Sequence, residues 1–129
     1  MKMISIARAF CGAALLAIAT LAGAGETAYS AAAFDRALAA GTPTIVHFRA
    51  SWCPTCKAQK PIVDALLHEP KRKEVTLFVA DYDTESALKQ RLHVAQQSTF
   101  VVFKGGKEIA RSTGETRKDA IAALFDKAS

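Results

Sequence analysis

The feature that most constrains this chain is a pair of cysteines, Cys53 and Cys56, where a strand-like segment gives way to a helix-like one. Residues 44–48 are almost continuously apolar or β-branched, which is typical of a strand buried on both faces of a sheet. A helical pattern begins at Cys53 or Pro54. A thiol in the first helical turn faces unpaired backbone N–H groups and the positive end of the helix dipole, which favour the thiolate. Cys53 is therefore the candidate nucleophile.

The N-terminal segment has the three regions of a secretory signal peptide. Two cations without an acid precede an apolar, alanine-rich run at residues 9–21, and an A-x-A cleavage site ends at Ala24. We expect residues 1–24 to be removed and residues 25–129 to form one periplasmic or otherwise exported domain. The alternative is an uncleaved N-terminal membrane anchor.

The charge of the predicted mature domain is too small to indicate nucleic-acid binding. The full chain has 17 Lys and Arg against 12 Asp and Glu. Two of the cations and none of the acids lie in the signal segment, so 15 basic and 12 acidic residues remain, a net charge of +3. We interpret the basic run Lys71-Arg72-Lys73 as a solvated loop. We expect a monomer without a nucleic-acid partner.

The number and spacing of the cysteines indicate exchange chemistry. Of the three cysteines, Cys11 lies in the signal segment, so the mature domain keeps only Cys53 and Cys56. Small exported proteins that depend on disulfides for stability carry several pairs. A disulfide across two residues closes too short a loop to restrict the unfolded chain much. We interpret this pair as a site of thiol–disulfide exchange.

The remaining pattern predicts alternating strands and helices around one sheet. The predicted elements are an edge strand at 26–29, a helix capped by Ser30 that ends near Gly41, a strand at 44–48, a helix from Cys53 or Pro54 that contains Pro61 and ends before Pro70, a strand at 75–80, a helix capped by Thr84, strands at 99–103 and 108–111 joined by a glycine turn, and a helix at 116–127. The helix that connects the strands at 44–48 and 75–80 implies that these two strands are parallel. The glycine turn implies that the strands at 99–103 and 108–111 are antiparallel. The expected fold class is α/β, a central mixed sheet with helices on both faces.

Two stretches of the sequence resemble the thioredoxin family. Residues 45–57, IVHFRASWCPTCK, resemble its active-site region, and residues 100–107, FVVFKGGK, resemble its later hairpin. The resemblance covers nearly the whole predicted domain and implies the thioredoxin fold. It also implies a redox-active disulfide in which Cys53, at the exposed helix end, forms a mixed disulfide that the buried Cys56 resolves.

The W-C-P-T-C motif is similar to that of exported thioredoxins and implies supporting roles for Trp52, Pro54 and Thr55. Pro54 suits the first helical position because the N–H that it lacks would be unpaired there anyway. Thr55 adds a hydroxyl near the sulfurs.

Ser98 departs from the family pattern, which has a cis-proline against the disulfide at this position. A cis bond without proline costs about 3–4 kcal/mol, so we expect the Gln97-Ser98 bond to be trans. One hypothesis is a substrate-docking loop at Gln97 and Ser98 with changed hydrogen bonding that also tolerates a metal at the thiols. The other is a polar loop that leaves ordinary exchange intact.

His47 also departs from the pattern, since the family usually has a buried acid there. One hypothesis is that His47 accepts the proton of the Cys56 thiol, directly or through water. The other is a neutral, hydrogen-bonded core histidine without a role in turnover. Arg49 could favour the thiolate electrostatically, but we interpret it as an exposed charge.

Together these patterns predict an extracytoplasmic thiol–disulfide oxidoreductase that needs no cofactor and no metal. We expect it to reduce oxidised protein substrates with electrons from a membrane-bound donor. An oxidant or isomerase of the same fold is the alternative, and an iron–sulfur cluster that bridges two chains is a third hypothesis. The reduction potential separates the first two.

Overall fold

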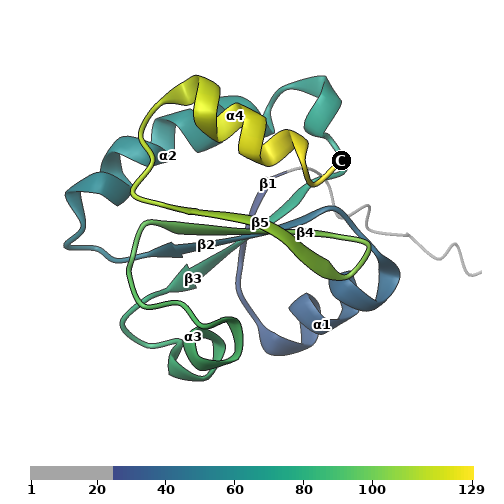
Figure 1. Ribbon diagram of the computed structural model, residues 1–129, viewed down its shortest axis with the longest axis horizontal. Helices are drawn as coiled ribbons and strands as arrows, with labels where there is room; N and C mark the ends of the chain where they lie inside the picture. The colour runs from purple at the N-terminus through teal and green to yellow at the C-terminus, as the bar shows by residue number, and fades with distance from the viewer. Residues whose placement is uncertain (1–24) are drawn as a thin grey trace, which may run out of the picture.

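The computed structural model describes residues 25–129, and in this range the chain forms one sheet covered by helices (Figure 1). The elements are β1 (Gly25–Ala28), α1 (Ala31–Ala40), β2 (Thr44–Arg49), α2 (Pro54–Leu67), the short 3₁₀ helix η1 (Pro70–Arg72), β3 (Thr76–Asp81), α3 (Ser86–Leu92), β4 (Thr99–Lys104), β5 (Lys107–Thr113) and α4 (Lys118–Asp126). Their order is the predicted one. The predicted signal peptide at residues 1–24 lies outside the described residues.

The strand order of the sheet is β1-β3-β2-β4-β5, with β2 at its centre. Strand β2 pairs parallel with β3 and antiparallel with β4, which confirms the predicted mixed sheet. Because β2 and β4 run in opposite directions, the end of β2 lies beside the start of β4, where Phe48 pairs with Thr99. The segment after β2, which contains the cysteines, is thereby brought beside the loop that precedes β4.

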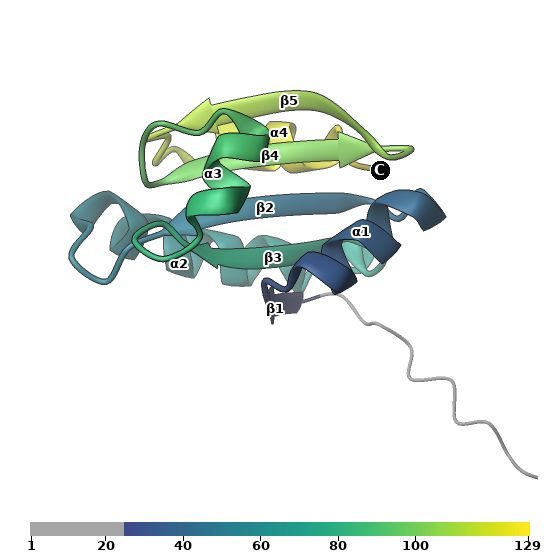
Figure 2. The ribbon, with the colours of Figure 1, turned by 90° about the horizontal axis from the view of Figure 1, so that it is seen from below.

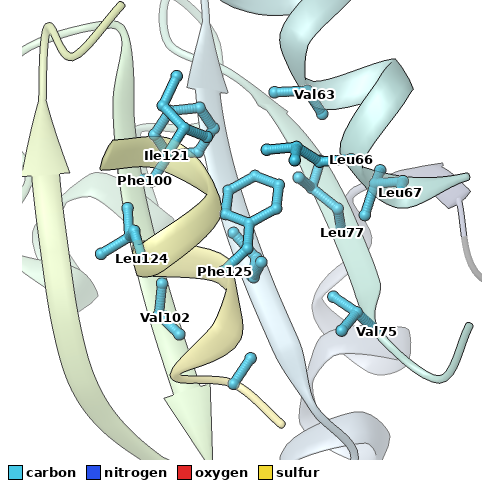
Figure 3. Packing of buried hydrophobic residues seen from close by; sticks show 12 residues of the cluster. Val63, Leu66, Leu67, Val75, Leu77, Phe100, Val102, Ile121, Leu124 and Phe125 are labelled. Carbon is cyan, nitrogen blue, oxygen red and sulfur yellow. The ribbon is translucent and has the colours of Figure 1, made fainter. Parts of the chain in front are cut away.

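The helices cover both faces of the sheet, as predicted. Helices α2 and α4 lie on one face, and α1 and α3 lie on the other (Figures 1 and 2). Successive residues of β2 point to opposite faces, so Ile45 belongs to the core below α2 and α4 and Val46 to the core below α1 and α3. Phe125 of α4 packs edge-on against Phe100 of β4 at 5.3 Å between ring centroids, at the centre of the first core (Figure 3). Within residues 25–129, no helix is long and apolar enough to cross a membrane.

Two helix termini show where local sequence signals succeed and fail. Ser30 caps α1 as predicted, since its hydroxyl accepts a hydrogen bond from the Ala33 N–H at 3.2 Å. The prediction that Thr84 caps α3 is wrong, because the N-cap is Glu85 and the helix begins one residue later. The Asp81 carbonyl accepts hydrogen bonds from the N–H groups of both Thr84 and Glu85. Thr84 therefore belongs to the turn after β3 and does not cap α3.

The basic run at 71–73 is not a uniformly solvated loop, and Arg72 corrects that interpretation. The Arg72 side chain is only 1% exposed and forms ion pairs with Glu69 and, at 2.7 Å, with Asp126 of α4. Helix η1 turns it beneath the end of α4, where its aliphatic part is covered. The neighbouring Lys71 is exposed, as expected.

We predict that Arg72→Ala lowers the free energy of unfolding by about 2 kcal/mol, because it removes buried aliphatic surface and the ion pairs with Glu69 and Asp126. Lys71→Ala is the matched control and should change it by less than about 0.5 kcal/mol, since Lys71 is solvated. Urea denaturation measures both. Equal effects of the two substitutions would show that Arg72 does not join η1 to α4.

Candidate active site

The two cysteines form a disulfide at the start of α2, with 5.3 Å between their Cα atoms. Cys53 is the N-cap, and Pro54 is the first helical residue, as predicted. The Cys53 sulfur accepts a hydrogen bond from the Cys56 N–H at 3.1 Å. A helix-end N–H is therefore directed at the sulfur on which a thiolate would form.

Cys53 is not exposed in this disulfide form, contrary to the expectation from its place at the helix end. Cys53 is 0% exposed and Cys56 is 4% exposed. The Cys53 sulfur turns back to cap α2, and Ala50 and Tyr82 pack with the two cysteines in a small apolar cluster. Position at a helix terminus does not imply exposure when the side chain folds back over the helix end.

Trp52 lies at the surface and precedes Cys53 in the chain, and Thr55 is half-buried in the first turn of α2. Trp52 is 54% exposed, and its indole N–H donates a hydrogen bond to the Asp83 carboxylate at 2.9 Å. Asp83 follows β3 and was not identified from the sequence. This bond joins the Trp52 ring to the turn after the neighbouring strand, so the ring lies fixed at the surface beside Cys53.

His47 lies in the middle of the sheet with both ring nitrogens in hydrogen bonds. Its Nδ1 accepts from the Arg49 Nε–H at 2.8 Å, and its Nε2 lies 2.8 Å from the Gln59 side-chain oxygen. Because a guanidinium only donates, Nδ1 must be the acceptor, which assigns the proton to Nε2. The ring also stacks on Phe100 at 4.1 Å between centroids.

Burial lowers the pKa of His47 from 6.5 to about 3, and the positive charge of Arg49 acts in the same direction. The imidazole is therefore neutral near pH 7, and neither nitrogen has a free lone pair for a thiol proton. The geometry favours the second hypothesis for His47, a hydrogen-bonded core residue.

Arg49 is largely buried, which corrects its interpretation as an exposed charge. Besides its bond to His47, its guanidinium pairs with Glu26 of β1 through two hydrogen bonds, one of them 3.0 Å long between Nη1 and Oε2. The sheet order explains this contact, because Arg49 reaches across β3 to the edge strand. Its charge is largely compensated there.

Gln59, like Asp83, is a residue of this site that sequence reasoning missed. It is fully buried in α2, where its carboxamide oxygen faces His47. Its NH₂ group donates to two backbone carbonyls, of Ser98 at 3.2 Å and of Glu115 at 2.9 Å. A signal was present, since Gln59 falls on the same helical face as the buried Cys56 and Val63, where an apolar residue is normal.

The loop before β4 is held at Ser98. Every peptide bond in the described residues is trans, which confirms the prediction for Gln97-Ser98, and Ser98 has a φ of 56°. Its N–H donates to the Phe48 carbonyl at 2.8 Å, and its carbonyl accepts from Gly114 at 3.0 Å. The Ser98 hydroxyl donates to the Gln97 carbonyl at 2.6 Å. These bonds fix the loop beside the end of β2, five residues before Cys53.

A surface cavity of about 570 Å³ opens beside Cys56. Its charged lining residues are Glu26, Arg49, Lys57, Lys60 and Asp81. Cys56, but not Cys53, borders this cavity. In residues 25–129, no three His, Cys, Asp or Glu side chains are grouped so that they could hold a metal ion.

The mixed α/β sheet and the Cys53–Cys56 disulfide at the end of its central strand define a thiol–disulfide oxidoreductase. The thioredoxin family model matches residues 26–127, so the chain belongs to the thioredoxin family and has the thioredoxin fold. A thioredoxin of Chlamydia trachomatis is 33% identical over 94 residues, which cover 73% of this chain and 89% of that protein. Thioredoxin-2 of Saccharomyces cerevisiae is 33% identical over 98 residues, 73% of this chain and 92% of that protein. The crystal structure of Trxlp from Edwardsiella tarda superposes with a TM-score of 0.77 at 37% identity and covers 78% of this chain and 98% of that one.

We predict a pH dependence of stability that arises from His47. Its folded pKa of about 3 lies below its unfolded value of 6.5, so the unfolded chain binds the proton first. Stability is full above pH 6.5 and is lost as the pH falls toward 3. Between pH 7 and pH 4 the protein should lose about 3 kcal/mol more than a His47→Gln variant.

Urea denaturation at both pH values measures this difference. His68→Gln is the control, because His68 is exposed and its replacement should leave the pH dependence nearly unchanged. The same loss of stability in the protein and in His47→Gln would show that His47 is not held neutral in the folded state.

Proposed function

We propose that this chain is an exported reductant of protein disulfides, in which Cys53 attacks the substrate and Cys56 releases it. The observation that carries the proposal is the placement of Cys53 as the N-cap of α2, with the Cys56 N–H directed at its sulfur. That N–H and the helix dipole favour the Cys53 thiolate over its thiol. The relatives named thioredoxin support the same chemistry.

The exchange takes place in two displacements. In the reduced protein, the Cys53 thiolate attacks one sulfur of a substrate disulfide, so the substrate S–S bond breaks and the other substrate sulfur leaves as a thiolate. The Cys56 thiolate then attacks the Cys53 sulfur, which releases the second substrate sulfur and forms the Cys53–Cys56 disulfide. Two electrons pass to the substrate, and a membrane-bound dithiol donor restores the reduced protein.

Before the second displacement, Cys56 must lose its thiol proton. His47 has no free lone pair, so we assign the proton to water in the cavity that Cys56 borders. The three cations that line the same cavity, Arg49, Lys57 and Lys60, outnumber its two acids, Glu26 and Asp81, so its small net positive charge favours the anionic sulfur. In this route, solvent accepts the Cys56 proton in place of His47.

We predict that Cys53→Ser lowers disulfide reductase activity by more than about 1000-fold, because the attacking sulfur is gone. Cys56→Ser should instead accumulate a mixed disulfide through Cys53, which non-reducing electrophoresis and mass spectrometry detect. Trapping through Cys56 in a Cys53→Ser variant would reverse the two roles.

The reduction potential tests the direction of electron flow. We expect a value near −270 mV by equilibration with glutathione, as for reducing members of this fold. A value near −120 mV would identify an oxidant of the same fold and refute the reductant.

We further predict export of the full chain with cleavage after Ala24. Expressed in a bacterium with a periplasm, the protein should appear in the periplasmic fraction with Gly25 as its first residue. N-terminal sequencing or intact mass measures this, and an Ala24→Asp variant, which disrupts the A-x-A site, is the control. A cytoplasmic protein that keeps its N-terminal segment would refute the export proposal.

A further inference from the structure

We propose that Gln59 is a positioning residue that holds the Ser98 loop against the helix of the cysteines, and so determines the affinity for peptide disulfides over small ones. The inference rests on the proposed function, because it concerns how that site takes its substrate. Gln59 touches neither sulfur, and its role is exerted through the backbone of two loops.

The carboxamide of Gln59 is the meeting point of three segments that are distant in sequence. Its oxygen accepts from His47 of β2, and its NH₂ group donates to the carbonyls of Ser98, before β4, and of Glu115, after β5. One acceptor and two donors are needed at this point, and a glutamine side chain supplies them. Glutamate and methionine of similar size cannot supply both donors.

The Ser98 loop depends on such contacts because its backbone conformation is unfavourable without them. Ser98 has a φ of 56°, a value that residues other than glycine seldom adopt. Besides the Gln59 bond, its backbone is held by Phe48 and Gly114. Gln59 is the only one of these partners that lies on α2, so it links the loop directly to the helix that carries Cys56.

Gln59 lies three residues after Cys56, on the same face of α2. Loss of the Gln59 NH₂ donors would free the Ser98 and Glu115 carbonyls from α2, while Cys53 still caps the start of the helix. We take the loop at Gln97 and Ser98, which lies beside the end of β2, as the surface that a peptide substrate contacts, whereas a small disulfide needs only access to the sulfur. The two substrate classes should therefore respond differently.

The experiment compares kcat and KM of Gln59→Met and Gln59→Glu for insulin and for hydroxyethyl disulfide. Methionine removes all three hydrogen bonds, and glutamate keeps only the acceptor that faces His47. We expect KM for insulin to rise about tenfold in both variants, which corresponds to the loss of one to two hydrogen bonds, with kcat within about twofold. The rate with hydroxyethyl disulfide should stay within about twofold. Gln90→Met, the same change at an exposed position of α3, is the control and should change neither substrate.

Amide hydrogen exchange gives a second measurement that does not depend on turnover. In both Gln59 variants the Ser98 and Gly114 amides should exchange at least about tenfold faster, because the loop has lost a fixed point. If the wild-type protein does not reduce hydroxyethyl disulfide, the proposed function is refuted. The hydrogen-exchange measurement still tests the role of Gln59 in that case.

Several results would overturn the inference. Equal losses with insulin and hydroxyethyl disulfide would make Gln59 a general structural residue, as would failure of both variants to fold. Unchanged KM for insulin, or unchanged exchange at Ser98 and Gly114, would show that the loop holds its position without Gln59.

Discussion

The hydrogen bond between His47 and Gln59 is the interaction on which the active-site end of this protein depends. It joins the central strand β2 to α2, the helix that the cysteines begin. On one side the network continues from His47 through Arg49 to Glu26 on the edge strand. On the other side it ends at the backbone carbonyls of Ser98 and Glu115, in two loops. Because His47 and Gln59 are both fully buried, the loss of either one leaves the other with an unsatisfied buried polar group.

This network is neutral at its centre, which distinguishes the site from one built on a buried acid. An imidazole with a pKa of about 3 and a carboxamide carry no charge near pH 7. The electrostatic preference for a thiolate must then come from the helix end at Cys53 and from the small excess of cations over acids around the cavity at Cys56. The neutral core separates the task of positioning from that of charge stabilisation.

The sequence allowed the element order, the mixed sheet and the helix start at the cysteines to be predicted, because apolar periodicity and capping act over a few residues. It did not reveal the burial of Cys53, which depends on how the sulfur packs against Tyr82. Arg72 and Gln59 were likewise out of reach, since each has a partner more than 50 residues away in the chain: Asp126 is 54 residues from Arg72, and Glu115 is 56 residues from Gln59. Such contacts can be predicted only when the order of the strands in the sheet is known. A glutamine at a core position of α2 was nevertheless a visible anomaly.

The claim that the core below the disulfide is neutral is tested most directly by the ¹⁵N NMR signals of the His47 ring. We predict that, from pH 4.5 to 8, both the oxidised and the reduced protein show a neutral imidazole with its proton on Nε2. A His47 ring that becomes protonated near neutral pH, or only when the cysteines are reduced, would contradict it. In that case His47 would take the proton of Cys56, and the Gln59 bond would not fix its tautomer.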